Sequence, residues 1–369
     1  MRILNEPVLT VNPQKIAFRT NIVQIIKKEC ADEKFFEKKR EAGVYAGDWD
    51  LTVSDFRKHD SWYKALEIYR AKHIDIYNTA DYKYYVKTIG ELDAKKFYVK
   101  WIEMYEDIKK NGYIWRPYEK DPWDEYILID IGRTGKMFLH NGRHRLAACL
   151  FCGVKEVPVK TAFRHPEWIK FKDKIAEYTK QHYDSVYSPL EHPDLACFKS
   201  NWSDLRPGLI LKHINKRART IVDLGAHWGH VSFQLAKHGF VCHAVERDKD
   251  NYSFLEKLNT VYKAPIRTHC KDVLSVLKSD IKYDCLLALN IFHHYLNDKQ
   301  HWDYFVECVK NIQCNEVFLQ LATNTQLAKS NKLNYKKDIE EAFAVFRASG
   351  FVKTEIGKEH ERSIYRLTR

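Results

Sequence analysis

Residues 220–240, "TIVDLGAHWGHVSFQLAKHGF", have the residue types needed to hold a ligand against the polypeptide backbone. Asp223 ends an apolar strand pattern, and Gly225 and Gly229 lie in the turn before an amphipathic helix pattern. Glycine leaves room for a ligand to approach the backbone, and free amides at a helix start face the same space. The next strand pattern ends in "HAVERD", with Glu246 about 20 residues further on, where a carboxylate can accept hydrogen bonds from both hydroxyls of a ribose. The spacing predicts a site for a ligand that contains a nucleoside.

A second group of reactive side chains ends the fourth strand pattern of this half of the chain, in "LALNIFHHYL". Asn290 stands at the end of the pattern and is expected to contact a bound ligand, and His293 and His294 follow it. An imidazole can take the proton of an attacking hydroxyl near neutral pH. We therefore expect one of the two histidines to act as a general base, and the sequence does not distinguish them.

These residues require a scaffold in which the ends of several strands meet. From residue 219 to residue 322 strand and helix patterns alternate, which is typical of right-handed crossovers in a parallel sheet covered on both faces. In such a sheet the ligand lies beyond the carboxyl ends of the strands, where the connections diverge. The last helix pattern stops at Gly350, and residues 351–369 predict two strands that form an antiparallel edge.

With this order of elements, residues 206–369 resemble the class I S-adenosylmethionine-dependent methyltransferases. The resemblance implies a Rossmann-like α/β sheet of about seven strands, the last one antiparallel, and S-adenosyl-L-methionine as the cofactor. By resemblance, the cofactor-binding residues are Asp223, Gly225, Ala226, His227, Gly229, Glu246, Arg247, Asp272, Val273 and Asn290. Glu246 would bind the ribose, and Asp272 with Val273 would lie beside the adenine. His227 departs from the family pattern, because many members carry a glycine there.

The residues around Asn290 indicate whether a nitrogen, a carbon or an oxygen atom would be methylated. Members that methylate the amino group of adenine or cytosine usually carry Pro-Pro-aromatic after the acidic residue or Asn, whereas Asn290 is followed by Ile291 and Phe292. The chain has no Pro-Cys pair, which disfavours methylation of a cytosine carbon. We therefore predict O-methylation, with His293 or His294 as the base.

A second glycine-bearing stretch, "FLHNGRHRLAACLF" at residues 138–151, predicts a helix that begins among basic side chains. Helix-start amides together with guanidinium groups attract phosphate. The candidate phosphate- or nucleotide-binding residues are Asn141, Gly142, Arg143, His144 and Arg145. The stretch is not a Walker loop, since the chain has no GxxxxGK[ST] pattern.

Residues 126–159 resemble the ParB/sulfiredoxin-like fold, with a strand–turn–strand pattern before the basic helix start and a further strand after the helix. The resemblance implies a small α+β domain that binds nucleotide phosphates. In its branch of small-molecule kinases the ligand would be ATP with Mg²⁺, and Asp130 or Glu103 would activate the acceptor. The alternative is a domain of this fold that only scaffolds the methyltransferase.

Shifts in pattern divide the chain into segments. These are a helical N-terminal extension (1–80), the ParB/sulfiredoxin-like domain (81–180), a linker that carries prolines and little periodicity (181–205) and the methyltransferase domain (206–369).

The chain is basic, with 61 lysines and arginines against 49 aspartates and glutamates and a net charge of +12, which predicts an anionic partner. We expect an anionic small molecule or glycan as substrate, and we prefer a sugar or phosphorylated glycan of a cell-surface polysaccharide. The alternative is a nucleic-acid-binding methyltransferase that acts on DNA or RNA, although the chain lacks the pattern of a helix-turn-helix, a zinc finger or a long basic arm.

The nine cysteines are odd in number and irregular in spacing, which predicts reduced thiols, no metal site and a cytoplasmic protein. No apolar run in the sequence is long enough to cross a bilayer. The sequence makes no prediction of the oligomeric state.

Overall fold

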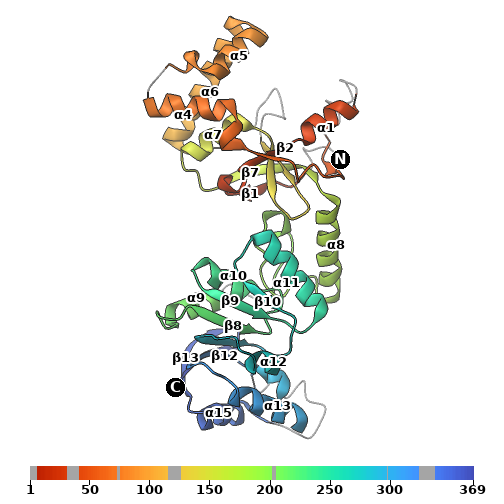
Figure 1. Ribbon diagram of the computed structural model, residues 1–369, viewed down its shortest axis with the longest axis vertical. Coiled ribbons are helices and arrows are strands. Elements are labelled where there is room, and N and C mark those ends of the chain that lie inside the picture. The colour runs from red at the N-terminus through yellow and green to blue at the C-terminus, as the bar shows by residue number, and fades with distance from the viewer. Residues whose placement is uncertain are drawn as a thin grey trace. The chain divides into compact units, whose positions relative to one another are not determined.

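The computed structural model describes residues 6–30, 41–72, 75–114, 126–201, 205–296, 298–323 and 337–369. The chain forms two compact units, whose elements can be followed in Figure 1. The N-terminal unit comprises Met1–Tyr178 and His192–Cys197, and the C-terminal unit comprises Thr179–Glu191 and Phe198–Arg369.

The C-terminal unit is built on a seven-stranded sheet with the strand order β10-β9-β8-β11-β12-β14-β13. Its strands are β8 (Thr220–Leu224), β9 (Val241–Val245), β10 (Arg267–His269), β11 (Cys285–Leu289), β12 (Glu316–Gln320), β13 (Val352–Glu359) and β14 (Arg362–Thr368). The first five run parallel, whereas β14 is antiparallel to both β12 and β13. The predicted Rossmann-like α/β sheet with an antiparallel edge is confirmed.

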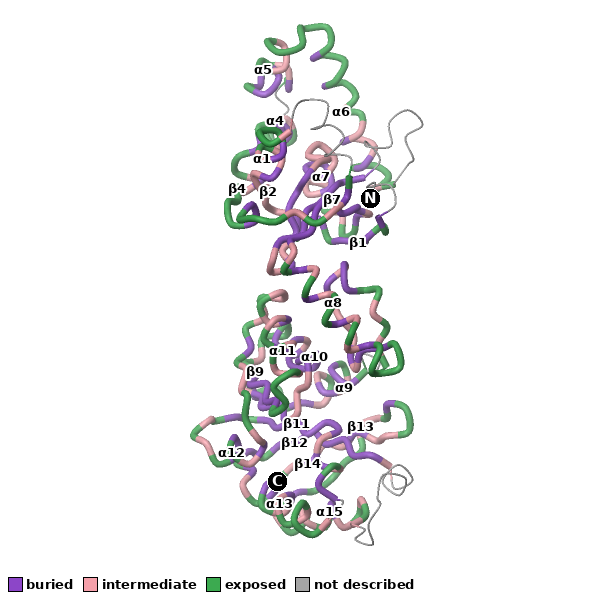
Figure 2. Tube along the Cα trace, turned by 90° about the vertical axis from the view of Figure 1, so that its right-hand side faces the viewer, coloured by how far each residue is buried: buried purple, intermediate pink, exposed green. Residues whose placement is uncertain are grey.

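A helix precedes each strand of this sheet from β8 to β13. These helices are α9 (Leu205–His213), α10 (His230–Lys237), α11 (Lys249–Tyr262), α12 (Val273–Leu277), α13 (Lys299–Lys310) and α15 (Ile339–Ala348), with a 3₁₀ turn, η6 (Phe292–Tyr295), after β11. α11, α12, α13 and α15 each begin at an aspartate whose carboxylate accepts a hydrogen bond from a backbone amide of the first turn. β11 and β12 are buried along their whole length, as Figure 2 shows, because helices cover both faces of a parallel sheet.

The strands that follow β8 in the chain lie on both sides of it in the sheet. After β8 the chain continues to β9 and β10 on one side, and it then crosses to β11 and β12 on the other side. The carboxyl ends of β8 and β11 therefore bound the topological switch point, where doubly wound sheets bind ligands.

The N-terminal unit contains a second sheet, with the strand order β1-β7-β5-β6-β2-β4 and with β3 paired to β7. The strands are β1 (Leu9–Val11), β2 (Phe18–Thr20), β3 (Gly43–Val44), β4 (Val53–Asp55), β5 (Ile127–Ile131), β6 (Met137–Asn141) and β7 (Val157–Arg164). The helices are α1 (Ile22–Glu29), α3 (Phe56–His59), α4 (Ser61–Lys72), α5 (Ala80–Ile89), α6 (Glu91–Asn111), α7 (Arg143–Phe151) and α8 (Pro166–Gln181), with the 3₁₀ turns η2 (Pro13–Lys15), η3 (Ile76–Asn78) and η5 (Pro193–Leu195). The expected succession of two strands, a basic helix start and a further strand is present as β5, β6, α7 and β7. The likeness to the ParB/sulfiredoxin-like fold stays a prediction.

The described part of residues 1–80 differs from the helical extension that we expected. It contains β1, β2, β3 and β4, which belong to the same sheet as β5, β6 and β7. These strands have only two or three residues each, which is too short for an alternating pattern to be recognised. The chain up to residue 178 therefore forms one unit, with no boundary near residue 80.

The segment expected to be a linker, residues 181–205, is divided between the two units. Residues 192–197 belong to the N-terminal unit, where Nε2 of His192 lies 2.8 Å from the carbonyl oxygen of Gly135. Residues 179–191 belong to the C-terminal unit, where the buried Val186 forms a bridge with Ser200. Prolines and weak periodicity indicate irregular structure here, but this irregular structure packs on a core. Residues 202–204 lie outside the described residues.

Candidate functional site

A cavity of about 210 Å³ lies at the switch point of the C-terminal unit. Its lining consists of Tyr187, Ser188, Arg206, Asp223, Gly225, Ala226, His227, His230, Val231, Glu246, Leu289, Asn290, Ile291 and His294. The candidate site residues among them are Asp223, Gly225, Ala226, His227, Glu246, Asn290 and His294. The structure thus brings residues from the ends of β8, β9 and β11 to one cavity.

The turn after β8 adopts the left-handed backbone region at two glycines, with φ +67 at Gly225 and φ +84 at Gly229. A Cβ atom on Gly229 would lie 2.4 Å from Cδ1 of Leu255, so packing against α11 requires this glycine. A Cβ atom on Gly225 would lie 2.9 Å from Cδ1 of Ile291. The space over Gly225 is therefore bordered by a side chain from the loop after β11, which the sequence did not predict.

His227, the residue that departs from the methyltransferase pattern, also has a left-handed backbone, with φ 52. This conformation costs a residue other than glycine about 1 kcal/mol. The His227 amide donates a 3.0 Å hydrogen bond to Oε2 of Glu246, and its ring centroid lies 5.1 Å from that of Tyr187. His227 thus adopts the backbone conformation that a glycine would adopt, and it adds an imidazole to the cavity wall.

Glu246 directly follows β9 and is buried. Its Oε2 accepts the hydrogen bond from His227, and its Oε1 accepts a 2.9 Å hydrogen bond from the amide of Asp248. Because a carboxylate oxygen has two acceptor positions, each oxygen retains one. The carboxylate is therefore held in place and can still accept two hydroxyl donors.

Asp223 lies inside β8, and its Oδ2 accepts a 2.8 Å hydrogen bond from Oγ of Ser232. Burial raises the pKa of Asp223 to about 6, while the Ser232 hydrogen bond and the charge of Arg206 act in the opposite direction. Asp223 therefore changes its charge within the range in which many enzymes work.

Asn290 follows β11 and is bonded to two residues that the sequence analysis did not single out. Its Nδ2 donates a 3.2 Å hydrogen bond to the hydroxyl of Tyr187, and its Oδ1 accepts a 2.7 Å hydrogen bond from Nη1 of Arg362. Arg206 also lines the cavity, and its Nε forms a buried ion pair of 3.0 Å with Oε2 of Glu359. Tyr187 was missed because it lies in the segment interpreted as a linker. Arg362 begins a strand that was expected to be antiparallel. The start of such a strand lies at the edge of the sheet where the parallel strands end, so the sequence could have indicated Arg362.

His294 lines the cavity, whereas His293 does not, and their ring centroids are 4.2 Å apart. Burial lowers the pKa of His293 to about 3, with smaller effects of His294 and Arg362. Burial, followed by the charges of Arg247 and Arg362, also lowers the pKa of His294. Both imidazoles are therefore neutral near pH 7, and His294 is the one at the cavity.

The remaining candidate residues of this unit lie outside the cavity lining, namely Gly229, Arg247, Asp272, Val273 and His293. Oδ1 of Asp272 accepts hydrogen bonds of 3.0 Å from the amide of Ser275, at the start of α12, and of 3.0 Å from the hydroxyl of Tyr304. Contact of Asp272 and Val273 with an adenine stays a prediction.

A second cavity, of about 530 Å³, lies in the N-terminal unit beside the start of α7. Its lining consists of Arg19, Tyr85, Lys100, Trp101, Met104, Asp107, Ile108, Tyr113, Ile114, Asn141, Gly142, Arg143, His144 and Arg145. All the candidate phosphate-binding residues therefore border one cavity, and α6 contributes aromatic and apolar side chains to its wall.

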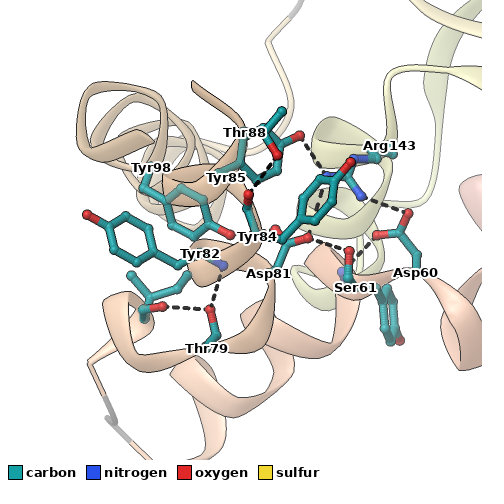
Figure 3. Close-up of polar contacts among 12 residues, drawn as sticks. Asp60, Ser61, Thr79, Asp81, Tyr82, Tyr84, Tyr85, Thr88, Tyr98 and Arg143 are labelled. Atoms are coloured by element: carbon teal, nitrogen blue, oxygen red, sulfur yellow. Dashed lines mark hydrogen bonds and ion pairs between the residues drawn. The ribbon is translucent and has the colours of Figure 1, made fainter. Parts of the chain in front are cut away.

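Arg143 is bonded to other side chains of the N-terminal unit (Figure 3). Its Nη1 donates a 3.3 Å hydrogen bond to Oδ2 of Asp60, and its Nη2 donates a 3.0 Å hydrogen bond to the hydroxyl of Tyr85. Nη2 also lies 3.8 Å from Oδ1 of Asp81, whose Oδ2 accepts a 2.5 Å hydrogen bond from Tyr98. Both aspartates are buried. Arg143 therefore neutralises buried carboxylates, which leaves fewer of its donors for a phosphate than the sequence suggested.

His144 and Arg145 have different environments although they are neighbours. The His144 ring stacks on Trp101 with the centroids 3.6 Å apart, and burial together with the charges of Arg143 and Arg145 lowers the pKa of His144 well below its usual range. His144 is therefore neutral. Among the described residues no ion pair of Arg145 is found, so Arg145 is the stronger candidate for a phosphate.

The two carboxylates considered for acceptor activation lie away from this cavity. Asp130 is fully buried in β5, where Oδ2 lies 3.0 Å from Nδ1 of His140 and Oδ1 accepts a 3.2 Å hydrogen bond from the amide of Phe163. Glu103 is exposed on α6 and does not line the cavity. Asp107 is the acidic residue in the lining.

Within the described ranges, no group of three or more His, Cys, Asp or Glu side chains could hold a metal ion. In the same ranges, no helix has both the length and the apolar character that spanning a membrane requires. All nine cysteines are free thiols. Burial raises the pKa of Cys149 to about 12, so the CxxC pair that it forms with Cys152 contains a poor nucleophile.

Several solved structures have a fold similar to part of the chain. WbdD, a bifunctional kinase-methyltransferase, is 16% identical over 52% of this chain and 45% of its own, with a TM-score of 0.42. The N-terminal domain of EvdMO1, solved with SAH and D-fucose, is 16% identical over 54% of this chain and 96% of its own, with a TM-score of 0.40. Magnesium protoporphyrin IX methyltransferase (ChlM) from Synechocystis PCC 6803, with bound SAM, is 13% identical over 54% of this chain and 96% of its own, with a TM-score of 0.37.

The matched part is thus less than half the length of WbdD, and likeness of this size does not determine an activity. No protein-family model and no curated protein sequence matches the chain. The Rossmann-like fold of the C-terminal unit rests on its own strand order and direction.

Proposed function

We propose that the C-terminal unit is an S-adenosylmethionine-dependent O-methyltransferase. The observation that carries the proposal is the convergence of Glu246, Asn290 and His294 on one cavity at the switch point. A carboxylate with two acceptor positions suits a ribose, and a neutral imidazole suits the deprotonation of a hydroxyl.

The residues around the cavity fit a nucleoside that carries a charged tail. Glu246 retains acceptor positions for both ribose hydroxyls, and the Arg206 guanidinium borders the same cavity and suits a carboxylate. When bound, S-adenosyl-L-methionine supplies a methyl group on a positively charged sulfur. Asp223 carries negative charge above about pH 6 and suits an ammonium group.

His294 acts as the base in this proposal. His294 would take the proton of the acceptor hydroxyl as that oxygen receives the methyl group that bound S-adenosyl-L-methionine would supply. His293 lies outside the cavity lining and has a packing role. Asn290, held by Tyr187 and Arg362, orients the ligand at the end of β11.

Calorimetry with S-adenosylhomocysteine tests the cofactor site. We expect the parent chain to bind, and Glu246→Ala to bind about tenfold more weakly or worse, because two ribose hydrogen bonds to a charged group are lost. Glu340→Ala is the matched control, since it removes an exposed carboxylate from α15. Absence of heat with the parent chain would refute the proposal.

For the acceptor, we propose a hydroxyl of an anionic sugar or of a phosphorylated glycan. The net charge of +12 and the presence of Arg206 in the cavity lining support this class. Transfer of a labelled methyl group from S-adenosylmethionine into a panel of sugars, glycans and nucleotides identifies the acceptor. The alternative acceptor is DNA or RNA, whose affinity for the protein would fall steeply as the salt concentration rises. If neither DNA nor RNA binds at low salt, this alternative is excluded.

We further propose that the N-terminal unit binds a nucleotide, which is ATP with Mg²⁺ if the unit is a kinase. The support is the cavity beside the start of α7, which combines the positive charges of Arg145 and Lys100 with the ring of Trp101. Asp107 is then the candidate carboxylate for acceptor activation. Titration with ATP, with and without Mg²⁺, tests the proposal, and no affinity in the parent chain leaves only the scaffold alternative.

A further inference from the structure

α6 lines the cavity of the N-terminal unit with one face of the helix. Trp101, Met104 and Ile108 all line this cavity, and they follow one another at intervals of three and four residues. Residues at these intervals are neighbours on a helix surface. Because a helix rises about 1.5 Å per residue, the three side chains form a wall that is about 10 Å long.

The Trp101 side chain in this wall is already in contact with other aromatic rings. The His144 ring, from the first turn of α7, stacks on it with the centroids 3.6 Å apart and the planes 17° apart. Trp62 and Tyr85 contact it edge-on, with their centroids 5.2 and 5.3 Å away. Trp101 is therefore fixed in place, and the face of its indole that His144 covers is not available to the base of a nucleotide.

Apolar surface that a ligand can cover lies further along the wall and in the segment after α6. Met104 is partly exposed. α6 ends at Gly112, which has a positive φ of 74, and Ile114 in the segment that follows also lines the cavity. Ile114 keeps 54% of its surface exposed. Because burial of such surface is favourable, exposed apolar side chains at a cavity favour a ligand with an apolar part.

The positive charge that suits the phosphates comes from Arg145, which lines the same cavity. In the part of the chain that the structure describes, Arg145 forms no ion pair, whereas Arg143 is bonded to Asp60 and Tyr85. A nucleotide combines anionic phosphates with a flat, uncharged base. The cavity likewise combines a guanidinium group with apolar side chains, so the two parts of a nucleotide have separate partners in its lining.

We infer that the base of the nucleotide bound by the N-terminal unit packs against Met104 and Ile114, while its phosphates are bound at Arg145. The inference rests on the proposed nucleotide site. It goes further in assigning the choice of a nucleotide over a phosphorylated sugar to the apolar side chains of α6 and of the segment after it. A ligand that has phosphates but no base lacks these contacts and binds more weakly.

Calorimetry with ATP and with inorganic triphosphate, which carries the anionic part alone, tests the contact with the base. Saturating S-adenosylhomocysteine is present throughout, so that the adenosine part of ATP does not enter the cavity of the C-terminal unit. We expect the parent chain to bind ATP about tenfold more tightly than triphosphate, because the base covers apolar surface. Equal affinities would overturn the inference. No binding of ATP by the parent chain would instead refute the proposed nucleotide site.

Substitutions in the lining separate the partners of the base from the partner of the phosphates. Met104→Gln and Ile114→Ser should each weaken the binding of ATP by about fivefold and leave the binding of triphosphate within about twofold of the parent chain. Arg145→Ala should remove the binding of both ligands. Val99→Gln is the matched control, since Val99 is an exposed apolar residue of α6 outside the cavity lining, and it should change neither affinity.

The comparison of the two ligands shows whether a substitution acts on the base or on the whole cavity. If Met104→Gln and Ile114→Ser bind ATP as tightly as Val99→Gln does, the base lies elsewhere and the inference is wrong. It is equally wrong if both substitutions weaken triphosphate as much as they weaken ATP, because they would then disturb the shape of the cavity rather than remove contacts with the base.

Discussion

The backbone amide of His227 donates a 3.0 Å hydrogen bond to Oε2 of Glu246, and it thereby ties the turn after β8 to the end of β9. The amide can point at the carboxylate because His227 has a positive φ of 52, which residues other than glycine rarely adopt. The backbone of the turn and the position of the proposed ribose-binding group therefore depend on each other.

Because of this backbone conformation, we predict that glycine at position 227 gives a more stable protein than alanine, which is the reverse of the usual order. Both His227→Gly and His227→Ala remove the imidazole and its stacking on Trp228, but only glycine adopts a positive φ without strain. We expect His227→Gly to be more stable than His227→Ala by about 1 kcal/mol, measured by urea unfolding. Alanine is normally the more stable of the two residues, so the normal order at this position would contradict the conformation described here.

The raised pKa of Asp223 predicts that Asp223→Asn stabilises the C-terminal unit at alkaline pH. Because the pKa rises from 3.8 to about 6 on folding, the folded state binds the proton more tightly than the unfolded state, and ionisation costs stability. We expect a gain of up to about 3 kcal/mol at pH 8, which decreases as the pH falls through about 6 and is absent below the unfolded pKa. Urea unfolding at several pH values measures it, with Asp303→Asn on the exposed face of α13 as the control. A gain that does not depend on pH would count against this account.

The lowered pKa of His294 predicts the pH profile of methyl transfer. A base must be unprotonated, so kcat/KM should stay level from pH 8 down to about 6.5, the usual pKa of histidine, and should fall only in more acidic solution. His294→Gln should reduce kcat by about a hundredfold or more, whereas His293→Gln should affect stability more than kcat. Full activity of His294→Gln would show that another group takes the proton.

The contacts of Arg143 and Arg145 predict opposite results for two neighbouring substitutions. Arg143→Ala removes a hydrogen-bonded cation from the buried Asp60, which keeps its ion pair with Arg19, and the nearby cation from Asp81, and should destabilise the N-terminal unit by about 2 kcal/mol. Arg145→Ala should change stability by no more than about 0.5 kcal/mol, and it should remove the affinity for ATP. Thermal unfolding and ATP titration of both variants check this pair. Equal loss of stability in the two variants would contradict the assignment.

The amino-acid sequence was enough to predict most of the C-terminal unit. β8, β9, β11 and β12 are short apolar runs, and the helices between them have an amphipathic period, so each element is specified by residues close together in the chain. Their alternation implies crossovers of one hand and a parallel sheet, with Gly225 and Glu246 at its carboxyl edge. The order of the strands comes from the structure.

Only the tertiary structure decided which side chains share a site. His293 and His294 are equivalent as a pattern, and the 3₁₀ turn η6 places one of them at the cavity. Arg362 lies 72 residues from Asn290 in the chain, and Arg143 lies 83 residues from Asp60. β1, β2, β3 and β4 are too short for a local pattern and form strands only because a sheet edge was available to pair with them. Local periodicity specifies elements, whereas contacts between distant residues depend on how the elements pack.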